Sequence, residues 1–143
     1  IVGIINKNVV INLELCNYEN IKLITLTTCE IKTIKRGLFF SSTDLLTRSL
    51  KRIDQLEKLL LIRDIKKSEE KLKEFLLYLS SIIGLKKDKH FYLNLKEFNF
   101  THKIIGNSIS STRVTVTRNL KILEKKGWLK FEKKGILIPF KDN

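Results

Sequence analysis

Over roughly the first quarter of the chain, the hydrophobic positions follow the short period typical of β-strands. β-branched and aliphatic residues dominate two runs, residues 9–15 and 21–35, with several threonines in the second run, and such residues favour strands. Residues 17–20, Asn-Tyr-Glu-Asn, separate the runs and suit a turn. Two strands alone are not stable in water. We therefore expect more sheet, a covering helix or a partner chain to complete this part.

Beyond residue 37 the hydrophobic period becomes that of a helix. Residues 41–44, Ser-Ser-Thr-Asp, offer side chains that cap a helix N-terminus. Apolar residues then recur at intervals of four, three, three and four, which is a heptad-like stripe; its members are Leu46, Leu50, Ile53, Leu56 and Leu60. One interpretation is an amphipathic helix packed on its own domain. The other is a dimerisation helix paired with its twin, which the narrow stripe and the small preceding sheet favour.

A second helix is predicted over residues 68–83. It begins with Ser-Glu-Glu-Lys, and Gly84 ends it. Its inner face consists of Leu72, Phe75, Leu76, Leu79, Ile82 and Ile83. A basic connector follows over residues 85–94, in which residues 91–93 form a short strand of aromatic and aliphatic side chains.

The last third of the chain predicts two short helices joined by a tight turn. Residues 101–105 form the first helix, capped by Thr101, and residues 106–108 begin the turn. The second helix runs over residues 113–126, opens with serines and threonine, and stops at Gly127. This is the arrangement of a helix-turn-helix, whose second helix enters the major groove of DNA.

The spacing of apolar residues orients the second of these helices. Val116, Leu120 and Leu123 lie on one stripe with Ile109 below them, so we expect them to pack on the first helix. The opposite side, near the N-terminal end, is then free to meet DNA.

Three residues on that free side are candidates for reading bases. Arg113 and Arg118 can each donate two hydrogen bonds to guanine, and Val114 suits the methyl group of thymine. The alternative role for the two arginines is a surface salt bridge. Hydroxyl groups nearby are candidates for phosphate contacts: Ser111, Thr112, Thr115 and Thr117.

After Gly127 the pattern predicts a β-hairpin. Residues 128–132 and 136–138 form its strands, and Lys133, Lys134 and Gly135 form its turn. We interpret the hairpin as a wing in which Lys133 and Lys134 touch DNA phosphates; the alternative is that both lysines are simply solvated.

Composition supports a polyanionic partner only in part. The 143 residues carry a net charge of +13, which favours nucleic acid or an anionic surface. However, lysine outnumbers arginine 22 to 6, isoleucine and asparagine are abundant, and alanine and methionine are absent. That bias indicates an A/T-rich genome, so some of the lysine reflects codon usage. We expect an organelle-encoded plastid (chloroplast) protein, or otherwise one of a bacterial cytoplasm, whose N-terminus is either truncated or uses an unusual start.

Several classes of protein lack support in the sequence. No apolar run approaches the ~18 residues that span a bilayer, and no secretory signal is visible. There is no C-x-x-C motif and no histidine pair at ligand spacing, which argues against a metal site. Cys16 and Cys29 are expected to be reduced, buried thiols. His90 and His102 are isolated, and no nucleophile–base pair or phosphate loop appears, so we predict that the chain is not an enzyme.

Residues 109–127, ISSTRVTVTRNLKILEKKG, resemble a known family. They are similar to the recognition-helix block of the cyanobacterial global nitrogen regulators and their plastid-encoded relatives, a branch of the Crp/Fnr superfamily. The resemblance implies an α+β chain with three parts: the remnant of an effector-sensing β-roll (residues 1–38), a dimerisation helix (39–63) and a winged helix-turn-helix (64–143). It also implies a transcription regulator of nitrogen-responsive genes. Such a regulator binds a palindrome in double-stranded DNA as a homodimer, with RNA polymerase as a partner and a preference for GTA/TAC-type sites.

The resemblance also implies an effector, 2-oxoglutarate. In that branch, barrel residues bind it together with an arginine and a glutamate on the dimerisation helix. Here Arg48 or Arg52, with Asp54 or Glu57, are the candidates on the corresponding helix. Only the last strands of the β-roll are expected in this chain. An alternative is therefore a degenerate paralogue that keeps its fold and dimerises as an interaction protein without sensing an effector.

Overall fold

The computed structural model describes residues 9–11, 24–25 and 27–139. Its elements follow one another in the order α1 (Arg36–Ser41), α2 (Thr43–Asp64), α3 (Ser68–Ile83), β1 (Leu85–Lys87), β2 (His90–Leu93), α4 (His102–Ser108), α5 (Arg113–Lys125), β3 (Lys130–Glu132) and β4 (Gly135–Pro139). The α+β class predicted from the sequence is confirmed, with a small antiparallel sheet and a C-terminal helix-turn-helix.

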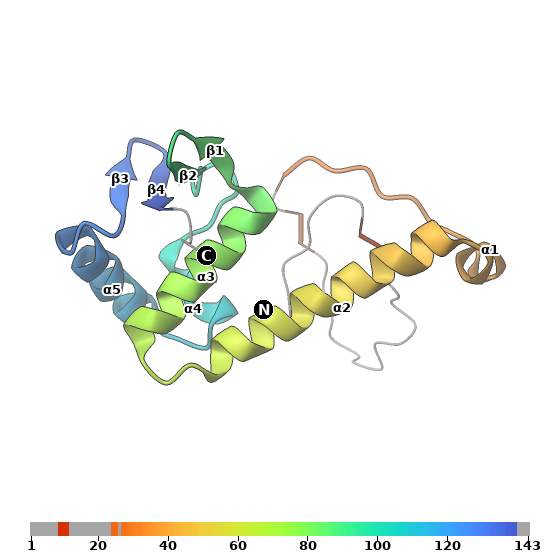
Figure 1. Ribbon diagram of the computed structural model, residues 1–143, viewed down its shortest axis with the longest axis horizontal. Coiled ribbons are helices and arrows are strands. Elements are labelled where there is room, and N and C mark those ends of the chain that lie inside the picture. Colours follow the sequence, from red (N-terminus) through yellow and green to blue (C-terminus); the bar gives the residue numbers. More distant parts are fainter. Residues whose placement is uncertain (1–8, 12–23, 26, 140–143) are drawn as a thin grey trace.

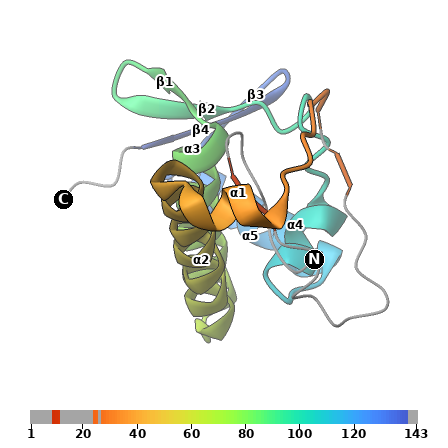
Figure 2. The same cartoon turned by 90° about the vertical axis from the view of Figure 1, so that its right-hand side faces the viewer.

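The long helix α2 projects from a domain that the later elements build. In Figure 1, α2 runs from α1 at one end of the molecule towards this domain, and α3 turns back from its end. Helix α5 and the β3–β4 hairpin lie at the end of the molecule opposite to α1. The side view shows α1 lying across the end of α2 that is distant from this domain, and the sheet above α3 (Figure 2).

The four strands form one antiparallel sheet in the order β1-β2-β4-β3. Strand β4 lies between β2 and β3: Ile136 is opposite Leu93 of β2 on one side and opposite Phe131 of β3 on the other. The predicted wing is therefore joined edge to edge with the hairpin that follows α3. The strand predicted over residues 91–93 is confirmed, and β1 pairs with it from Leu85 to Lys87.

One hydrophobic core holds the helices of this domain together. Helix α3 is its centre, because Leu72, Phe75, Leu76 and Leu79 have no accessible surface. The core continues into α2, the sheet and both helices of the helix-turn-helix; Leu59, Leu93, Ile105, Ile109, Val116, Leu120, Leu123, Ile136 and Ile138 are each at most 1% exposed. The predicted bounds of α3 are confirmed. Four of its six predicted inner residues are fully buried, whereas Ile82 and Ile83 are half-buried.

The first part of the chain differs from the sequence-based expectation. The described residues 9–11, 24–25 and 27–35 include no strand, so the prediction of a strand is wrong where the structure describes residues 21–35. A strand requires a neighbouring ladder of hydrogen bonds, and residues 24–25 and 27–35 are exposed along their described length. Cys29 is exposed as well, which corrects the expectation of a buried thiol. Residues 9–11 of the first predicted strand are described and form no strand either, whereas Cys16 and the remaining predicted strand residues lie outside the described ones.

Three polar contacts fix α2 to the rest of the domain. Arg63 Nε donates to the carbonyl oxygen of Ser108 at the end of α4, 2.8 Å away. Lys71 Nζ donates to the carbonyl oxygen of Arg63 at 2.8 Å, and the hydroxyl of Tyr78 donates to the carbonyl oxygen of Gln55 at 3.3 Å. Two of these contacts satisfy carbonyl groups at helix ends, and together they set the angle at which α2 leaves the helix-turn-helix.

Within the described residues, no helix is both long enough and apolar enough to cross a membrane.

Candidate nucleic-acid interface

The turn between α4 and α5 depends on one glycine and one left-handed residue. Gly106 is buried in α4, and a Cβ there would lie 2.7 Å from the carbonyl oxygen of Ser111. Ser110 has a φ of 53°, a conformation that non-glycine residues seldom adopt. The predicted first helix is three residues too short, because residues 106–108 are helical. The turn itself occupies residues 109–112, and Ser111 N donates to Gly106 O at 2.8 Å.

Side-chain caps set the start of both helices, as the sequence predicts. The hydroxyl of Thr101 accepts a hydrogen bond from Ile104 N at 3.2 Å. That of Thr112 accepts one from Thr115 N at 3.1 Å. Capping of this kind satisfies backbone N–H groups that have no partner within the helix. Helix α5 ends at Lys125, and Gly127 follows with a φ of 69°.

The orientation predicted for α5 is confirmed on its inner side. Val116, Leu120 and Leu123 are buried together with Ile109. Asn119 shares this inner side and is 3% exposed. Among the described residues, nothing forms a hydrogen bond with its amide nitrogen Nδ2.

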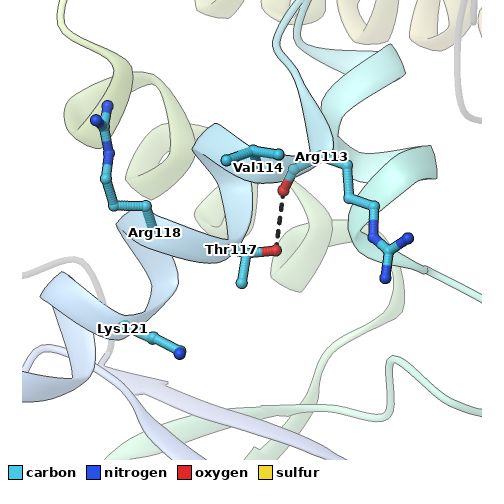
Figure 3. Close-up of a pocket in the computed structure, with 5 residues that line it drawn as sticks. All are labelled: Arg113, Val114, Thr117, Arg118 and Lys121. Carbon is cyan, nitrogen blue, oxygen red and sulfur yellow. Dashed lines mark hydrogen bonds between the residues drawn. The ribbon is translucent and has the colours of Figure 1, made fainter.

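The outer side of α5 is an open, basic surface. Arg113, Val114, Thr117, Arg118 and Lys121 line a shallow depression of about 520 Å³. The two guanidinium groups extend to opposite sides of the helix, with Val114 between them (Figure 3). Val114 is 76% exposed. Neither arginine makes an ion pair with any described residue, so the salt-bridge alternative has no support there.

Lys121 belongs to this surface, although it is not among the residues predicted from the sequence. It is seven residues after Val114, and seven residues bring a helix back to within about 20° of the same direction. Its ammonium therefore lies along the same line as Val114, nearly one turn beyond Arg118. The seven-residue spacing was the available signal.

The hydroxyl groups predicted to bind phosphates differ in the hydrogen bonds that they already form within the chain. The hydroxyls of Thr112 and Thr115 lie 2.9 Å apart; their single hydrogen bond uses one proton, so the other proton is free to be donated. Thr117 donates its proton to the carbonyl oxygen of Arg113 at 2.9 Å. In this arrangement the Thr117 proton is engaged within the helix, and the contact of Thr117 with a phosphate stays a prediction. Ser111 is half-buried in the turn.

A histidine of α4 contacts this threonine. Nδ1 of His102 lies 2.8 Å from the Thr117 hydroxyl oxygen. Burial lowers the pKa of His102, and the positive charge of Arg113 lowers it further. His102 also lines a second open depression, of about 340 Å³, with Thr101, Lys103 and Arg113.

The predicted hairpin is present, although β3 begins only at Lys130 and Gly135 belongs to β4 rather than to the turn. Glu132 pairs with Gly135, so Lys133 and Lys134 form the tip, where both are exposed. The carbonyl oxygen of Lys134 accepts a hydrogen bond from Lys96 N at 3.1 Å. The tip is thereby attached to the segment that precedes α4, and its two side chains remain available for phosphates.

The C-terminal end of α5 is anchored on α3. Lys126 Nζ lies 2.7 Å from Oε1 and 2.9 Å from Oε2 of Glu69, and the hydrogen bond lowers the pKa of that carboxyl group. Lys73 Nζ lies 5.4 Å from the centre of the Trp128 ring, a cation–π distance. Together with the buried inner side, these contacts hold α5 as a rigid element.

The predicted dimerisation helix leaves its stripe uncovered. Leu46, Leu50, Ile53 and Leu60 are 39%, 65%, 51% and 61% exposed, and Leu56 is half-buried. A different face of α2 packs on the core, through Leu59 and Ile62. The stripe and the packed face are thus separate sides of one helix.

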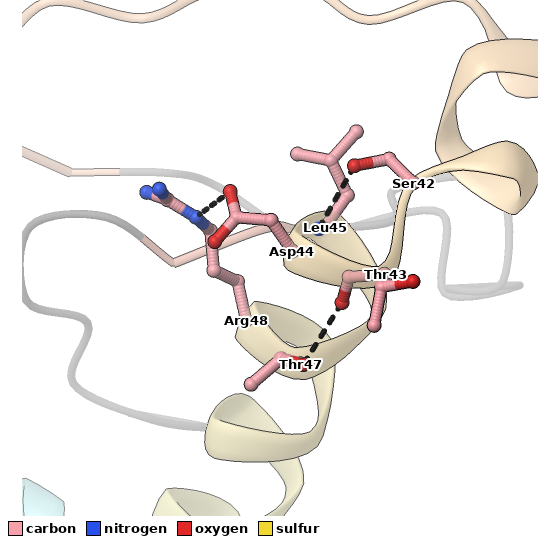
Figure 4. Close-up of polar contacts among 6 residues, drawn as sticks. All are labelled: Ser42, Thr43, Asp44, Leu45, Thr47 and Arg48. Atoms are coloured by element: carbon pink, nitrogen blue, oxygen red, sulfur yellow. Dashed lines mark hydrogen bonds and ion pairs between the residues drawn. The ribbon is translucent and has the colours of Figure 1, made fainter.

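The candidate effector residues lie along the same helix. Ser42 caps α2, accepting a hydrogen bond from Leu45 N at 3.4 Å, and Thr47 donates to the carbonyl oxygen of Thr43 (Figure 4). Arg48 Nε donates to Asp44 Oδ2 at 2.7 Å. Asp54 pairs in the same way with Lys58 at 2.9 Å, and Arg52 takes part in an interaction of its own.

Comparison with solved structures shows the same fold. A CRP-family transcriptional regulator from Thermus thermophilus superposes with a TM-score of 0.55 at 16% identity, over 68% of this chain and 50% of its own. A CooA mutant from Carboxydothermus hydrogenoformans gives 0.57 at 23% identity, over 74% and 49%. A second CRP/FNR-family regulator from Thermus thermophilus gives 0.51 at 18% identity, over 68% and 50%.

The chain spans about half the length of these structures. No curated protein matches it in sequence. The model of the Crp-like helix-turn-helix domain matches residues 70–142, which is more than half of the chain and contains α4, α5 and the wing. The chain therefore belongs to the family defined by the Crp-like helix-turn-helix domain.

Proposed function

We propose that this protein is a sequence-specific transcription regulator that binds a palindromic DNA site as a homodimer, with α5 in the major groove. The outer side of α5 carries the proposal. It presents an exposed valine between two arginines that pair with no described carboxylate, on a helix whose other side is buried in a Crp-like domain. An exposed apolar side chain between two arginines has no stabilising role in the isolated chain, and it suits a surface that reads base edges.

Each residue of this surface has a proposed task. Arg113 and Arg118 each donate a pair of hydrogen bonds to guanine, and Val114 contacts a thymine methyl. The hydroxyl pair of Thr112 and Thr115, with Ser111, donates to phosphates. Lys133 and Lys134 at the wing tip add phosphate contacts, which position the domain without reading sequence.

The homodimer forms through the exposed stripe of α2. Its members are separated by four, three, three and four residues, which is close to the pattern by which two identical helices pack along one seam. A symmetric dimer places its two α5 helices about one turn of DNA apart, at half-sites ~34–36 Å from each other. The palindrome then mirrors the symmetry of the protein.

A finer assignment rests on residues 109–127. Their resemblance to the global nitrogen regulators supports regulation of nitrogen-responsive genes and a GTA/TAC-type half-site, with RNA polymerase as a partner. Valine at position 114 supports assignment of the chain to the same branch. The A/T-biased composition supports a plastid-encoded protein.

Binding of 2-oxoglutarate is expected to be weak or absent in these 143 residues. Arg48 already pairs with Asp44, so a dicarboxylate bound there must displace a carboxylate. The Arg48–Asp44 pair agrees with the alternative in which the regulator dimerises without sensing this effector. Isothermal titration calorimetry with 2-oxoglutarate tests this directly, and tight binding would contradict it.

The proposed function is tested by selection from a pool of random duplexes. The protein should enrich duplexes that carry two inverted half-sites, and the enriched site should bind at least about a thousandfold more tightly than a scrambled duplex. Enrichment of single, non-repeated sites would argue against the homodimer. Equal affinity for enriched and scrambled duplexes would argue against sequence-specific regulation altogether.

A further inference from the structure

His102 lies beside two cationic side chains, Lys103 and Arg113, next to the outer side of α5. Together with Thr101 they line the open depression of about 340 Å³ where α4 meets the start of α5. None of the four lining residues carries a carboxylate. The charged groups beside the imidazole are therefore Lys103 on its own helix and Arg113 on the helix packed against it, and both are positive.

The hydrogen bonds around Thr117 determine which ring nitrogen of His102 carries a proton. The Thr117 hydroxyl has one proton, and it is donated to the carbonyl oxygen of Arg113. With the hydroxyl proton on that carbonyl oxygen, the contact with Nδ1 of His102 at 2.8 Å is one in which Nδ1–H donates and the hydroxyl oxygen accepts. In a neutral imidazole this leaves Nε2 unprotonated, and no described residue bonds to it.

An unprotonated Nε2 cannot donate to a phosphate, because phosphate oxygens are acceptors. Protonation turns Nε2 into a charge-assisted donor while Nδ1 keeps its bond to Thr117. In the free protein, burial and Arg113 lower the pKa of His102, which favours the neutral ring. A phosphate seated in the depression brings a negative charge that favours the protonated ring.

We infer that His102 and Lys103, beside the guanidinium of Arg113, form a site for a backbone phosphate of the bound DNA, and that His102 takes up a proton when this site is filled. The inference rests on the proposed function and adds to it a coupling between DNA affinity and pH. The sign follows from the direction of uptake: binding that consumes a proton strengthens as pH falls. The affinity for DNA therefore rises as the solution becomes mildly acidic.

Replacing His102 with Asn gives the sharpest test. The Asn side-chain NH₂ occupies about the place of Nδ1, so the donor to Thr117 is kept while the titrating Nε2 is lost. His90→Asn is the matched control, because His90 is the other of the two histidines and lies in β2, outside the depression. Thermal unfolding of both variants verifies that each remains folded.

The measurement is fluorescence anisotropy of the enriched duplex between about pH 8 and about pH 6, the range in which histidine titrates. The parent and His90→Asn should bind at least about threefold more tightly at the lower pH, with up to about tenfold per pH unit for each proton taken up. His102→Asn should show little of this gain. The salt dependence of the parent should also steepen by about one unit per protomer at the lower pH.

Three outcomes would overturn the inference. If His102→Asn kept the full pH dependence of the parent, His102 would not be the group that takes up the proton. If NMR titration of the imidazole gave the same pKa in free and DNA-bound protein, no phosphate would reach the ring. In both cases the proposed function would stand. If the parent bound no duplex at any pH, the proposed function and the inference would fail together.

Discussion

At the scale of single residues, Asn119 is a buried amide whose Nδ2 has no hydrogen-bond partner among the described residues. It is 3% exposed on the inner side of α5. Burying an amide without a partner costs about 1–3 kcal/mol. Leucine has a similar size and needs no partner.

Asn119→Leu is therefore expected to stabilise the protein by about 1–2 kcal/mol. The midpoint of unfolding in urea measures the change. Asn107→Leu is the matched control, because Asn107 is exposed on α4 and its replacement should add no stability. A loss of stability in Asn119→Leu would mean that the amide has a partner in solution.

The sequence identified most residues of the candidate interface, because helical periodicity separates inner from outer positions. Arg113, Val114 and Arg118 lie outside and Val116 lies inside, as periodicity predicts. It could not show that Thr117 is engaged by His102 and by the carbonyl of Arg113. The contact with His102 joins residues fifteen positions apart and depends on how α4 crosses α5.

At the scale of elements, the turn of the helix-turn-helix depends on the close approach of α4 to the residues before α5. A Cβ at Gly106 would lie 2.7 Å from Ser111 O and 3.2 Å from Thr112 C. Both are backbone atoms, so the turn itself would have to move, and Thr112 is the cap of α5.

Gly106→Ala is expected to destabilise the protein by about 1–3 kcal/mol and to weaken binding to DNA, since the start of α5 is displaced. Thermal unfolding and DNA titration measure the two effects. Gly37→Ala is the control: nothing lies within 4 Å of a Cβ at Gly37 in α1, so it should remain as stable as the parent. A fully stable Gly106→Ala would show that the turn can relax.

Element prediction succeeded where local signals agree and failed where distant partners decide. Helix α3 has its predicted bounds because a charged first turn, an apolar stripe and Gly84 all lie within one segment. The strands predicted over residues 21–35 are not found in the described part of that range. A strand is defined by its neighbours, and β-branched composition alone does not supply them.

At the scale of the whole molecule, the stripe of α2 is an apolar surface that the other described residues leave exposed. Leu50, Ile53 and Leu60 are each more than half exposed. Lysines at Ile53 and Leu60 would place charges on the seam, so the double variant Ile53→Lys, Leu60→Lys is expected to be monomeric and to lose specific DNA binding. Analytical ultracentrifugation measures the mass of each species.

The control for that variant is Asp54→Asn with Glu57→Gln, which changes the net charge by the same amount but leaves the stripe intact. It should remain dimeric. A monomeric parent protein at concentrations that support DNA binding would contradict the proposed dimer.

The most direct test of the account compares one arginine of α5 with one lysine of the wing. The palindromic and scrambled duplexes are titrated at several salt concentrations with the parent, Arg118→Ala and Lys133→Ala. Loss of a bidentate base contact costs about 1–3 kcal/mol on the specific duplex alone. Arg118→Ala should therefore lower the ratio of specific to non-specific affinity. Lys133→Ala should keep that ratio and reduce the salt slope by about one unit. Equal losses on both duplexes for Arg118→Ala would show that Arg118 contacts the backbone, and that α5 does not read DNA in the proposed orientation.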